Sequence, residues 1–281
     1  MAWYSKYLSI YGKNFDEVSN DIISETRERL AALQSEKPLA SIVVIAYNEE
    51  QHLQACLWAL SEIKCKYPVE IIGVDNDSKD RTADIFEASG IPYYTEYQHS
   101  CGYARRCGLQ HSKGKYYFDI DSDTIYPPHY FDIMLKELLK PDVSCVSSLW
   151  SYFPDENHSW IGLKLFEACR DLFLYIQHFK RPELSVRGLV FAYNADYARQ
   201  EEYRVDIIRG EDGSMALCLK KYGRIAFIYN RKARAITGYG TLSSDSLFKS
   251  FIKRITIQTK GITRIFYTKD HYEDADDNLV K

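Results

Sequence analysis

The sequence predicts an α/β protein with a mostly parallel sheet flanked by helices. Between residues 41 and 120, apolar β-branched runs that suit buried strands alternate with runs that have helical periodicity. Such alternation is typical of right-handed strand–helix–strand crossovers, which produce parallel sheets. Three polar clusters follow three of these strands directly: Tyr47-Asn48-Glu49, Asp75-Asn76-Asp77 and Asp121-Ser122-Asp123. Because ligands of parallel sheets bind beyond the carboxyl ends of the strands, these clusters are the candidate site.

The expected elements follow one another without internal repeats. Strands are expected at 41–46, 69–74, 92–95, 116–120, 142–149, 189–195 and 225–229, and helices at 50–62, from the turn 75–80 through 88, and at 102–111, 126–139, 161–179 and 209–222. Ser78 or Asp80 is expected to cap the second helix, and residues 150–160 are expected to form a polar and aromatic loop. A helical extension at 1–38 is expected before a core domain at 39–240. A C-terminal helical extension with an acidic tail is expected at 241–281.

Composition and charge exclude several classes of protein. The chain has 281 residues and a formal net charge of −3, so nothing attracts it generally to nucleic acid. It has no apolar run near the ~20 residues that a membrane-spanning helix needs, and its first residues, MAWYSKYLSIYGKNF, are too polar for a signal peptide. Its 7 cysteines are irregularly spaced, with no CxxC pair to suggest zinc. These features predict a cytoplasmic protein with reduced thiols.

The segment 116–124 carries the strongest chemical signal. A buried strand ends here in Asp119, Asp121 and Asp123, which alternate along the chain and therefore share one face of the strand. Three neighbouring carboxylates repel one another unless a cation lies among them. Oxygen ligands suit Mg²⁺ or Mn²⁺, which also bind phosphate oxygens. The competing interpretation is that the aspartates cap the following helix, for which one would suffice. The pattern therefore favours a metal site that holds a diphosphate.

Four runs of the sequence resemble the glycosyltransferases of family 2, which have the GT-A fold. They are SIVVIAYNEE, IIGVDNDSKDRT, GYARRCGLQHSKGKYYFDIDSDT and GEDGSMALCLKKYG, in matching order over about residues 40–225. The resemblance implies inverting transfer of a sugar from a UDP- or GDP-sugar to a hydroxyl group of a glycan or lipid-linked acceptor. It implies Mn²⁺ or Mg²⁺ as cofactor and a role in cell-surface polysaccharide or glycolipid synthesis. The QxxRW element of processive synthases is absent, so transfer of a single sugar is expected.

The resemblance also implies a nucleotide-binding half at 39–125 and an acceptor half at 126–240. Ala46, Tyr47 and Glu49 are expected to contact the nucleoside, although Glu49 also suits the first turn of a helix. Asp75 and Asn76 are expected to lie against the base. Asn76 stands where the family frequently has aspartate, and its amide can both donate and accept hydrogen bonds.

The same resemblance assigns the groups around the diphosphate. Asp121 and Asp123 match the family's DxD motif and would bind the metal, with Ser122 beside the nucleotide. Asp119 would be a buried support for them. Arg105 would orient the diphosphate and neutralise its charge.

A carboxylate at the start of the helix at 209–222 would accept the proton of the attacking hydroxyl. Asp212 is expected to do so, with Glu211 as the second choice, because GED resembles the family's ED motif. Two acids in the first turn of a helix are also favourable for electrostatic reasons alone.

Other interpretations stay open. A sugar nucleotidyltransferase usually has a glycine-rich basic loop after the first strand, where this chain has YNEE. A non-catalytic subunit that binds nucleotide sugars would not need the intact acids Asp121, Asp123 and Asp212. The basic amphipathic segment 247–267 suits either peripheral contact with the inner face of an anionic membrane or a helix packed on the core.

Overall fold

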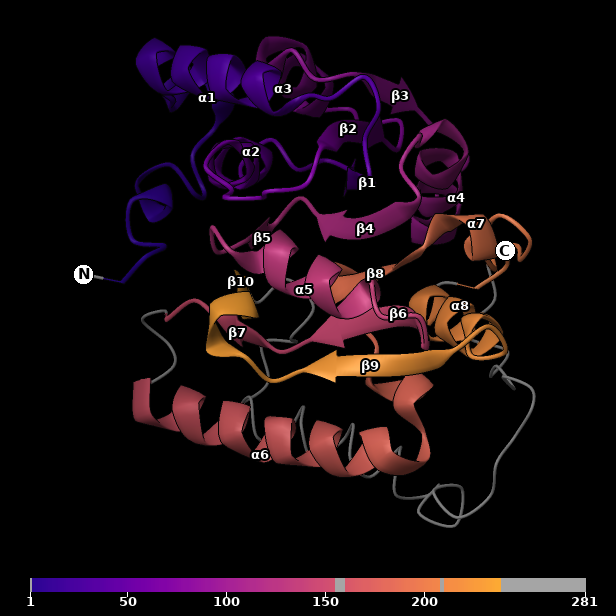
Figure 1. Cartoon of the computed structure of the whole chain (residues 1–281). Helices are drawn as coiled ribbons and strands as arrows, with labels where there is room; N and C mark the ends of the chain where they lie inside the picture. Colours follow the sequence, from indigo (N-terminus) through magenta and orange to yellow (C-terminus); the bar gives the residue numbers. More distant parts are fainter. Residues whose placement is uncertain (1, 155–159, 208–209, 239–281) are drawn as a thin grey trace.

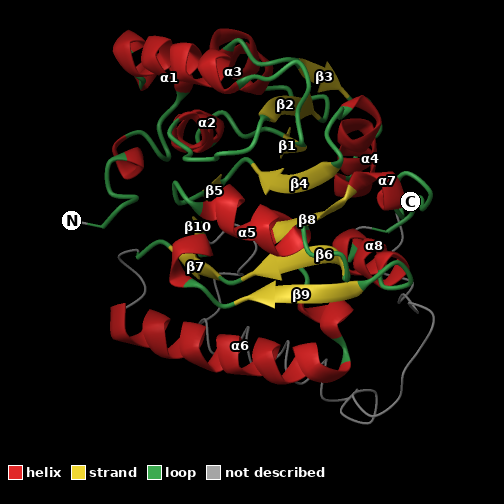
Figure 2. Ribbon diagram, viewed as in Figure 1, coloured by secondary structure: helices red, strands yellow, loops and turns green. Residues whose placement is uncertain are grey.

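A single large sheet is the central feature of the computed structural model, which describes residues 2–154, 160–207 and 210–238 (Figures 1 and 2). In these ranges seven strands form the sheet, in the order β3–β2–β1–β4–β8–β6–β9. They are β1 Ala40–Ala46, β2 Val69–Asp75, β3 Tyr93–Thr95, β4 Tyr116–Asp121, β6 Val143–Ser148, β8 Phe191–Asn194 and β9 Arg224–Ile228. Among them, β8 alone runs antiparallel to its neighbours, β4 and β6. The expected α/β fold with a mostly parallel sheet is confirmed.

Helices cover both faces of the sheet. One face packs against α1 Asn20–Leu33, α2 Leu53–Ser61, α3 Thr82–Ser89 and α5 Tyr130–Leu138, and the other against α4 Cys101–His111, α7 Ala195–Ala198 and α8 Glu211–Leu219. Side-chain alternation builds both cores at once, because Ile42 and Val44 of β1 face the first core while Val43 and Ile45 face the second. α6, Trp160–Lys180, lies beside β9 and β7 at one end of the assembly (Figure 1).

A second, small sheet was not expected from the sequence. Within the described residues it is ordered β5–β10–β7 and consists of β5 Thr124–Ile125, β10 Ala235–Thr237 and β7 Trp150–Tyr152. Two or three residues are too few to show the alternation that identifies a strand. The expected loop at 150–160 is therefore wrong at its start. α5 begins at Tyr130 rather than at 126, after Pro127 and Pro128.

The N-terminal residues 7–11 pack against α2 and the turn that follows β4. Tyr7 and Ile10 pack with Trp58 of α2 in a third apolar cluster. The Tyr11 hydroxyl donates a hydrogen bond to the backbone carbonyl of Asp123 at 2.9 Å. No helix in the described ranges is long and apolar enough to cross a bilayer. The expected extension at 241–281 lies outside the described residues.

Candidate active site

Three strand ends lie side by side at the carboxyl edge of the large sheet. In the strand register, Ala46 of β1 pairs with Asp75 of β2, and Ile45 of β1 pairs with Asp121 of β4. The three polar clusters meet as expected, because β2, β1 and β4 are parallel neighbours.

The loop after β1 is fixed by side chains from the loop after β2. The Ser78 hydroxyl accepts a hydrogen bond from the Asn48 amide at 2.9 Å, and the Thr82 hydroxyl accepts one from the Glu49 amide at 2.8 Å. Of the two residues expected to cap α3, Asp80 does so, because its carboxylate accepts a hydrogen bond from the Thr82 amide at the start of the helix at 2.9 Å. Ser78 instead holds the backbone that presents the first polar cluster.

Tyr47 and Glu49 differ in whether their side chains are free to contact a ligand. The Tyr47 ring is 50% exposed and meets the His99 ring edge-on, with centroids 5.3 Å apart. The Glu49 carboxylate lies 2.7 Å from Nδ1 of His52. Burial lowers the pKa of His52, but the hydrogen bond and charge of Glu49 outweigh it and raise that pKa. Tyr47 therefore offers a ring face for stacking, whereas Glu49 is committed to an ion pair.

The hydrogen bonds of Asn76 explain why an amide, rather than a carboxylate, follows β2. Its side-chain nitrogen donates to the carbonyl of Glu96 at 2.7 Å and to the carbonyl of Gln98 at 2.8 Å. An ionised aspartate at this position would have no proton to donate to either carbonyl, so it would lose both hydrogen bonds. Asp75 is buried and accepts a hydrogen bond from the Ser78 amide at 3.3 Å. Contact of either residue with a base stays a prediction.

Asp121 and Asp123 lie at the end of β4. The Asp121 side chain is 34% exposed, while burial, helped by the charges of Asp121 and Glu49, raises the pKa of Asp123 to about 6. A bound cation relieves such repulsion. Across the described ranges, no group of three or more histidine, cysteine or acidic side chains is arranged to hold a metal ion. Two carboxylates alone fit Mn²⁺ or Mg²⁺ that is shared with phosphate oxygens. Ser122 between them is buried.

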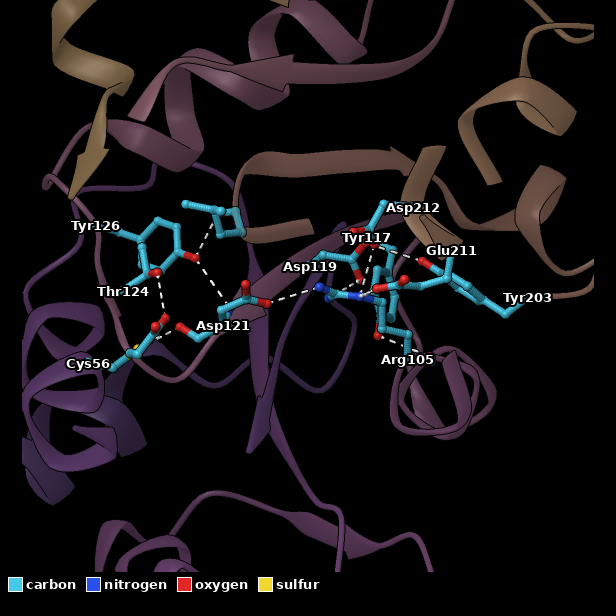
Figure 3. A network of polar contacts seen from close by, with 12 residues as sticks. Cys56, Arg105, Tyr117, Asp119, Asp121, Thr124, Tyr126, Tyr203, Glu211 and Asp212 are labelled. Carbon is cyan, nitrogen blue, oxygen red and sulfur yellow. Dashed lines mark hydrogen bonds and ion pairs between the residues drawn. The ribbon is translucent and has the colours of Figure 1, made fainter. Parts of the chain in front are cut away.

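Arg105 of α4 lies between Asp121 and the acids of α8 (Figure 3). Its guanidinium donates a hydrogen bond to Asp121 at 2.9 Å and lies 3.1 Å from Asp119 and 3.0 Å from Asp212. Glu211 is farther away, at 3.8 Å. The Arg105 side chain is 3% exposed and is surrounded by carboxylates. Its direct contact with a diphosphate stays a prediction.

The carboxylates around Arg105 carry more negative charge than one guanidinium can balance. Burial is the largest cause of the raised pKa of Asp119, with Arg105 opposing it and Asp212 adding to it. Burial, followed by the charge of Asp212, raises the pKa of Glu211 to about 7. The pKa of Asp212 is also raised by burial, against the opposing charge of Arg105. Raised carboxyl pKa values of this kind are common at catalytic sites, where a base must hold and release protons near neutral pH.

Comparison with known proteins decides the family. The model of the family described as "Glycosyl transferase family 2" matches residues 41–201, which is more than half of the chain. The chain belongs to glycosyl transferase family 2. The matched range includes all three strand ends and Arg105, whereas Asp212 and Glu211 lie beyond it.

Named relatives of this family 2 chain are similar over part of their length. An uncharacterized glycosyltransferase of Rickettsia prowazekii (strain Madrid E) is 32% identical over 107 residues, which cover 37% of this chain and 33% of that protein. A putative glycosyltransferase, EpsH of Bacillus subtilis (strain 168), is 29% identical over 106 residues, 36% of this chain and 30% of that protein. The chain thus matches about a third of the length of these curated relatives.

Solved structures share the fold at low identity. A mannosyltransferase from Pyrobaculum calidifontis in complex with GDP-Man and Mn²⁺ has a TM-score of 0.59 and 15% identity, covering 95% of this chain and 76% of that one. Glucosyl-3-phosphoglycerate synthase from Mycobacterium tuberculosis, in complex with Mn²⁺, UDP-glucose and phosphoglyceric acid, has a TM-score of 0.53 and 19% identity, covering 88% and 85%. The GT-A fold of this family 2 chain is therefore confirmed.

The sequence did not indicate several residues that shape the site of this family 2 chain. A Cβ on Gly188 would lie 1.9 Å from Nη2 of Arg105 and 2.5 Å from Oδ2 of Asp212, so only glycine fits there. The Tyr203 hydroxyl donates to Asp119 at 3.2 Å. Neither residue belongs to a motif, and both come from segments far from β4 in the sequence, so local spacing carried no signal for them.

Proposed function

We propose that the chain transfers a glycosyl group from a nucleotide-diphosphate sugar to a hydroxyl acceptor. One observation carries the proposal: the guanidinium of Arg105 contacts both Asp121, at 2.9 Å, and Asp212, at 3.0 Å. The candidate metal ligand and the candidate base therefore lie within the width of one side chain. A sugar whose diphosphate rests at Asp121 would have its anomeric carbon near Asp212.

At the donor end, Tyr47, Asp75 and Asn76 would surround the nucleoside beyond Ala46. Asp121 and Asp123 would hold Mn²⁺ or Mg²⁺, whose charge stabilises the departing diphosphate. Two folds similar to this one are known with Mn²⁺ and a nucleotide sugar, GDP-Man in one and UDP-glucose in the other. That likeness supports the donor class and leaves the choice between a UDP- and a GDP-sugar to experiment.

At the acceptor end, Asp212 would take the proton of the attacking hydroxyl as that oxygen bonds to the anomeric carbon and the bond to the diphosphate breaks. A direct displacement of this kind inverts the configuration. Glu211 is the second candidate, since its pKa of about 7 also suits a base at neutral pH. Asp212 is preferred because it lies closer to Arg105, whose charge favours its ionised form.

The domain organisation, the acceptor and the cellular location are also part of the proposal. The division into an extension at 1–38, a catalytic core at 39–240 and an extension at 241–281 is supported by the match at 41–201. We propose a single-sugar, non-processive transfer to a glycan or lipid-linked acceptor in cell-envelope synthesis, by a cytoplasmic protein. The segment 247–267, proposed for peripheral membrane contact, lies outside the described residues.

Nucleotide release from a panel of UDP- and GDP-sugars, with Mn²⁺ or with chelator, tests the proposal. Asp121→Asn and Asp123→Asn should abolish metal-dependent release, and Asp212→Asn should bind donor as the wild type does while losing transfer. Glu211→Gln is the matched comparison for the base. Wild-type turnover in both Asp121→Asn and Asp123→Asn would disprove the metal assignment. Pyrophosphate release from a nucleoside triphosphate would instead identify a nucleotidyltransferase.

A further inference from the structure

The outer face of α6 carries a row of exposed apolar side chains. Ile161 is 74% exposed, Leu172 is 61% exposed and Phe179 is 70% exposed. Exposed apolar residues between them complete the row: Leu165, Tyr175 and Ile176. Each of these residues lies three, four or seven positions from another member of the row, which places them along one side of the helix, with the adjacent Tyr175 and Ile176 at its two borders. Single exposed apolar residues are ordinary, but a row that runs the length of a helix marks a surface that contacts something apolar.

The acidic residues of α6 are turned away from this row. Glu167 is 3% exposed, accepts a hydrogen bond from the Tyr152 amide at 3.0 Å and pairs with Lys164 at 2.7 Å. Asp171 is 19% exposed and pairs with Arg170 at 2.8 Å. Both carboxylates thus serve the interior of the protein and its own cations.

Basic residues, in contrast, lie at the edges of the row. The Lys164 side chain is 46% exposed despite its ion pair, and Lys180 at the end of α6 is exposed as well. Tyr229 contacts the Tyr175 ring edge-on, with centroids 5.3 Å apart, and adds an aromatic side chain beside the row. An apolar row with aromatic residues and basic edges is typical of a helix that lies in a membrane interface.

We propose that the outer face of α6 lies on the surface of an anionic lipid bilayer. Apolar side chains would enter the boundary between headgroups and acyl chains, and the basic edge would meet anionic headgroups. Charge disfavours the chain's own basic segment 247–267 as the cover, and if the acidic residues that follow it covered α6 instead, wild type and α6 variant would float equally. That segment carries Lys249, Lys253, Arg254, Lys260 and Arg264, and α6 turns no acidic side chain outward to meet them. The same basic edge would oppose itself across a contact with a second copy.

The position of α6 connects this surface to the site. Arg170 of α6 donates to the carbonyl of Trp150 in β7, β7 pairs with β10, and β10 pairs with β5, which directly follows Asp123. Two strand spacings separate β7 from β5, or about 10 Å. Docking through α6 would hold the diphosphate end of the site close to the membrane. Delivery of sugar to an acceptor hydroxyl on a lipid headgroup is the one step that also rests on the proposed function.

Flotation of the full-length protein with vesicles tests the proposal. Vesicles of phosphatidylcholine alone are compared with vesicles of equal parts phosphatidylcholine and phosphatidylglycerol. The test variant is Leu172→Gln/Ile176→Gln, and the control is Leu139→Gln at the residue that follows α5, where the leucine is 38% exposed. Wild type and control should float with anionic vesicles, less so at high salt. The α6 variant should bind at least ~tenfold more weakly, because two apolar side chains leave the interface. Circular dichroism and nucleotide release with a soluble acceptor should be unchanged, which separates this result from a failure of the proposed function.

Several results would overturn the proposal. Equal flotation of wild type and α6 variant would exclude α6 as the contact. If Lys253→Gln/Arg254→Gln abolished binding while the α6 variant kept it, the segment 247–267 would be the membrane contact instead. No flotation of the wild type, together with sedimentation as a dimer that the α6 variant dissolves, would identify the surface as a contact between two copies.

Discussion

Gly188→Ala is expected to disable the site by steric conflict alone. The added methyl group would lie 1.9 Å from Nη2 of Arg105 and 2.5 Å from Oδ2 of Asp212. Neither group can move away easily, because the Arg105 side chain is 3% exposed and the Asp212 side chain is 13% exposed. Gly188 must shift, or the ion pair of 3.0 Å between Arg105 and Asp212 must open.

The expected loss of stability depends on which of these two rearrangements costs less free energy. Overpacking a rigid core costs typically ~1–3 kcal/mol, and opening a buried ion pair costs roughly 3–5 kcal/mol. The protein takes the cheaper route, so we expect the free energy of unfolding to fall by about 2 kcal/mol. If Asp212 is the base, as proposed, its displacement by about 1 Å should lower kcat on the order of a hundredfold. Urea denaturation and nucleotide-release kinetics measure the two effects separately.

A double-mutant cycle identifies the clashing group. Arg105→Met removes the guanidinium that the methyl group would meet, so Gly188→Ala should cost at least ~1 kcal/mol less stability in that background. If the cost were the same in both backgrounds, the conflict with Arg105 would not be its cause. Wild-type stability and kcat in Gly188→Ala itself would refute the packing described here.

Three further predictions concern charge and hydrogen bonding. Asn76→Asp places a carboxylate against two backbone carbonyls, so donor KM should rise roughly tenfold, for a cost of about 1–2 kcal/mol, whereas Asp84→Asn on α3, where the side chain is 54% exposed, should leave KM unchanged. The folded pKa of Glu211, about 7 against an ordinary 4.5, means that the native state holds a proton that the unfolded chain has released. Stability should therefore fall by on the order of 3 kcal/mol as pH rises from 4.5 to 7, and a flatter profile is expected for Glu211→Gln in urea titrations at each pH. Tyr203→Phe removes the hydroxyl that donates to buried Asp119; it should lower the free energy of unfolding by about 1–2 kcal/mol, and an unchanged value would show that this hydrogen bond is not stabilising.

Sequence patterns predicted the parts of the fold that depend on local regularity. β1 and β2 are rich in β-branched apolar residues, β4 begins with three aromatic ones, and each strand ends in a polar cluster, so both their type and their endpoints could be inferred. β5, β7 and β10 are too short to show periodicity, and they exist because they pair with one another. The antiparallel direction of β8 likewise depends on how the chain returns to the sheet, which its apolar residues do not encode.

Some residues of the candidate site could likewise be predicted from local sequence, and others could not. Asp121, Asp123 and Asp212 were inferred from motifs whose residues are adjacent in sequence. Gly188 acts through shape, and a missing side chain leaves no chemical signal in a sequence. Arg105 belongs partly to each group, because its presence in the site was predicted from a motif but its contacts were not. Its motif predicted a functional cation, but its partners come from β4 and α8, so its contact with both the candidate metal ligand and the candidate base depends on distances that appear only when the chain is folded.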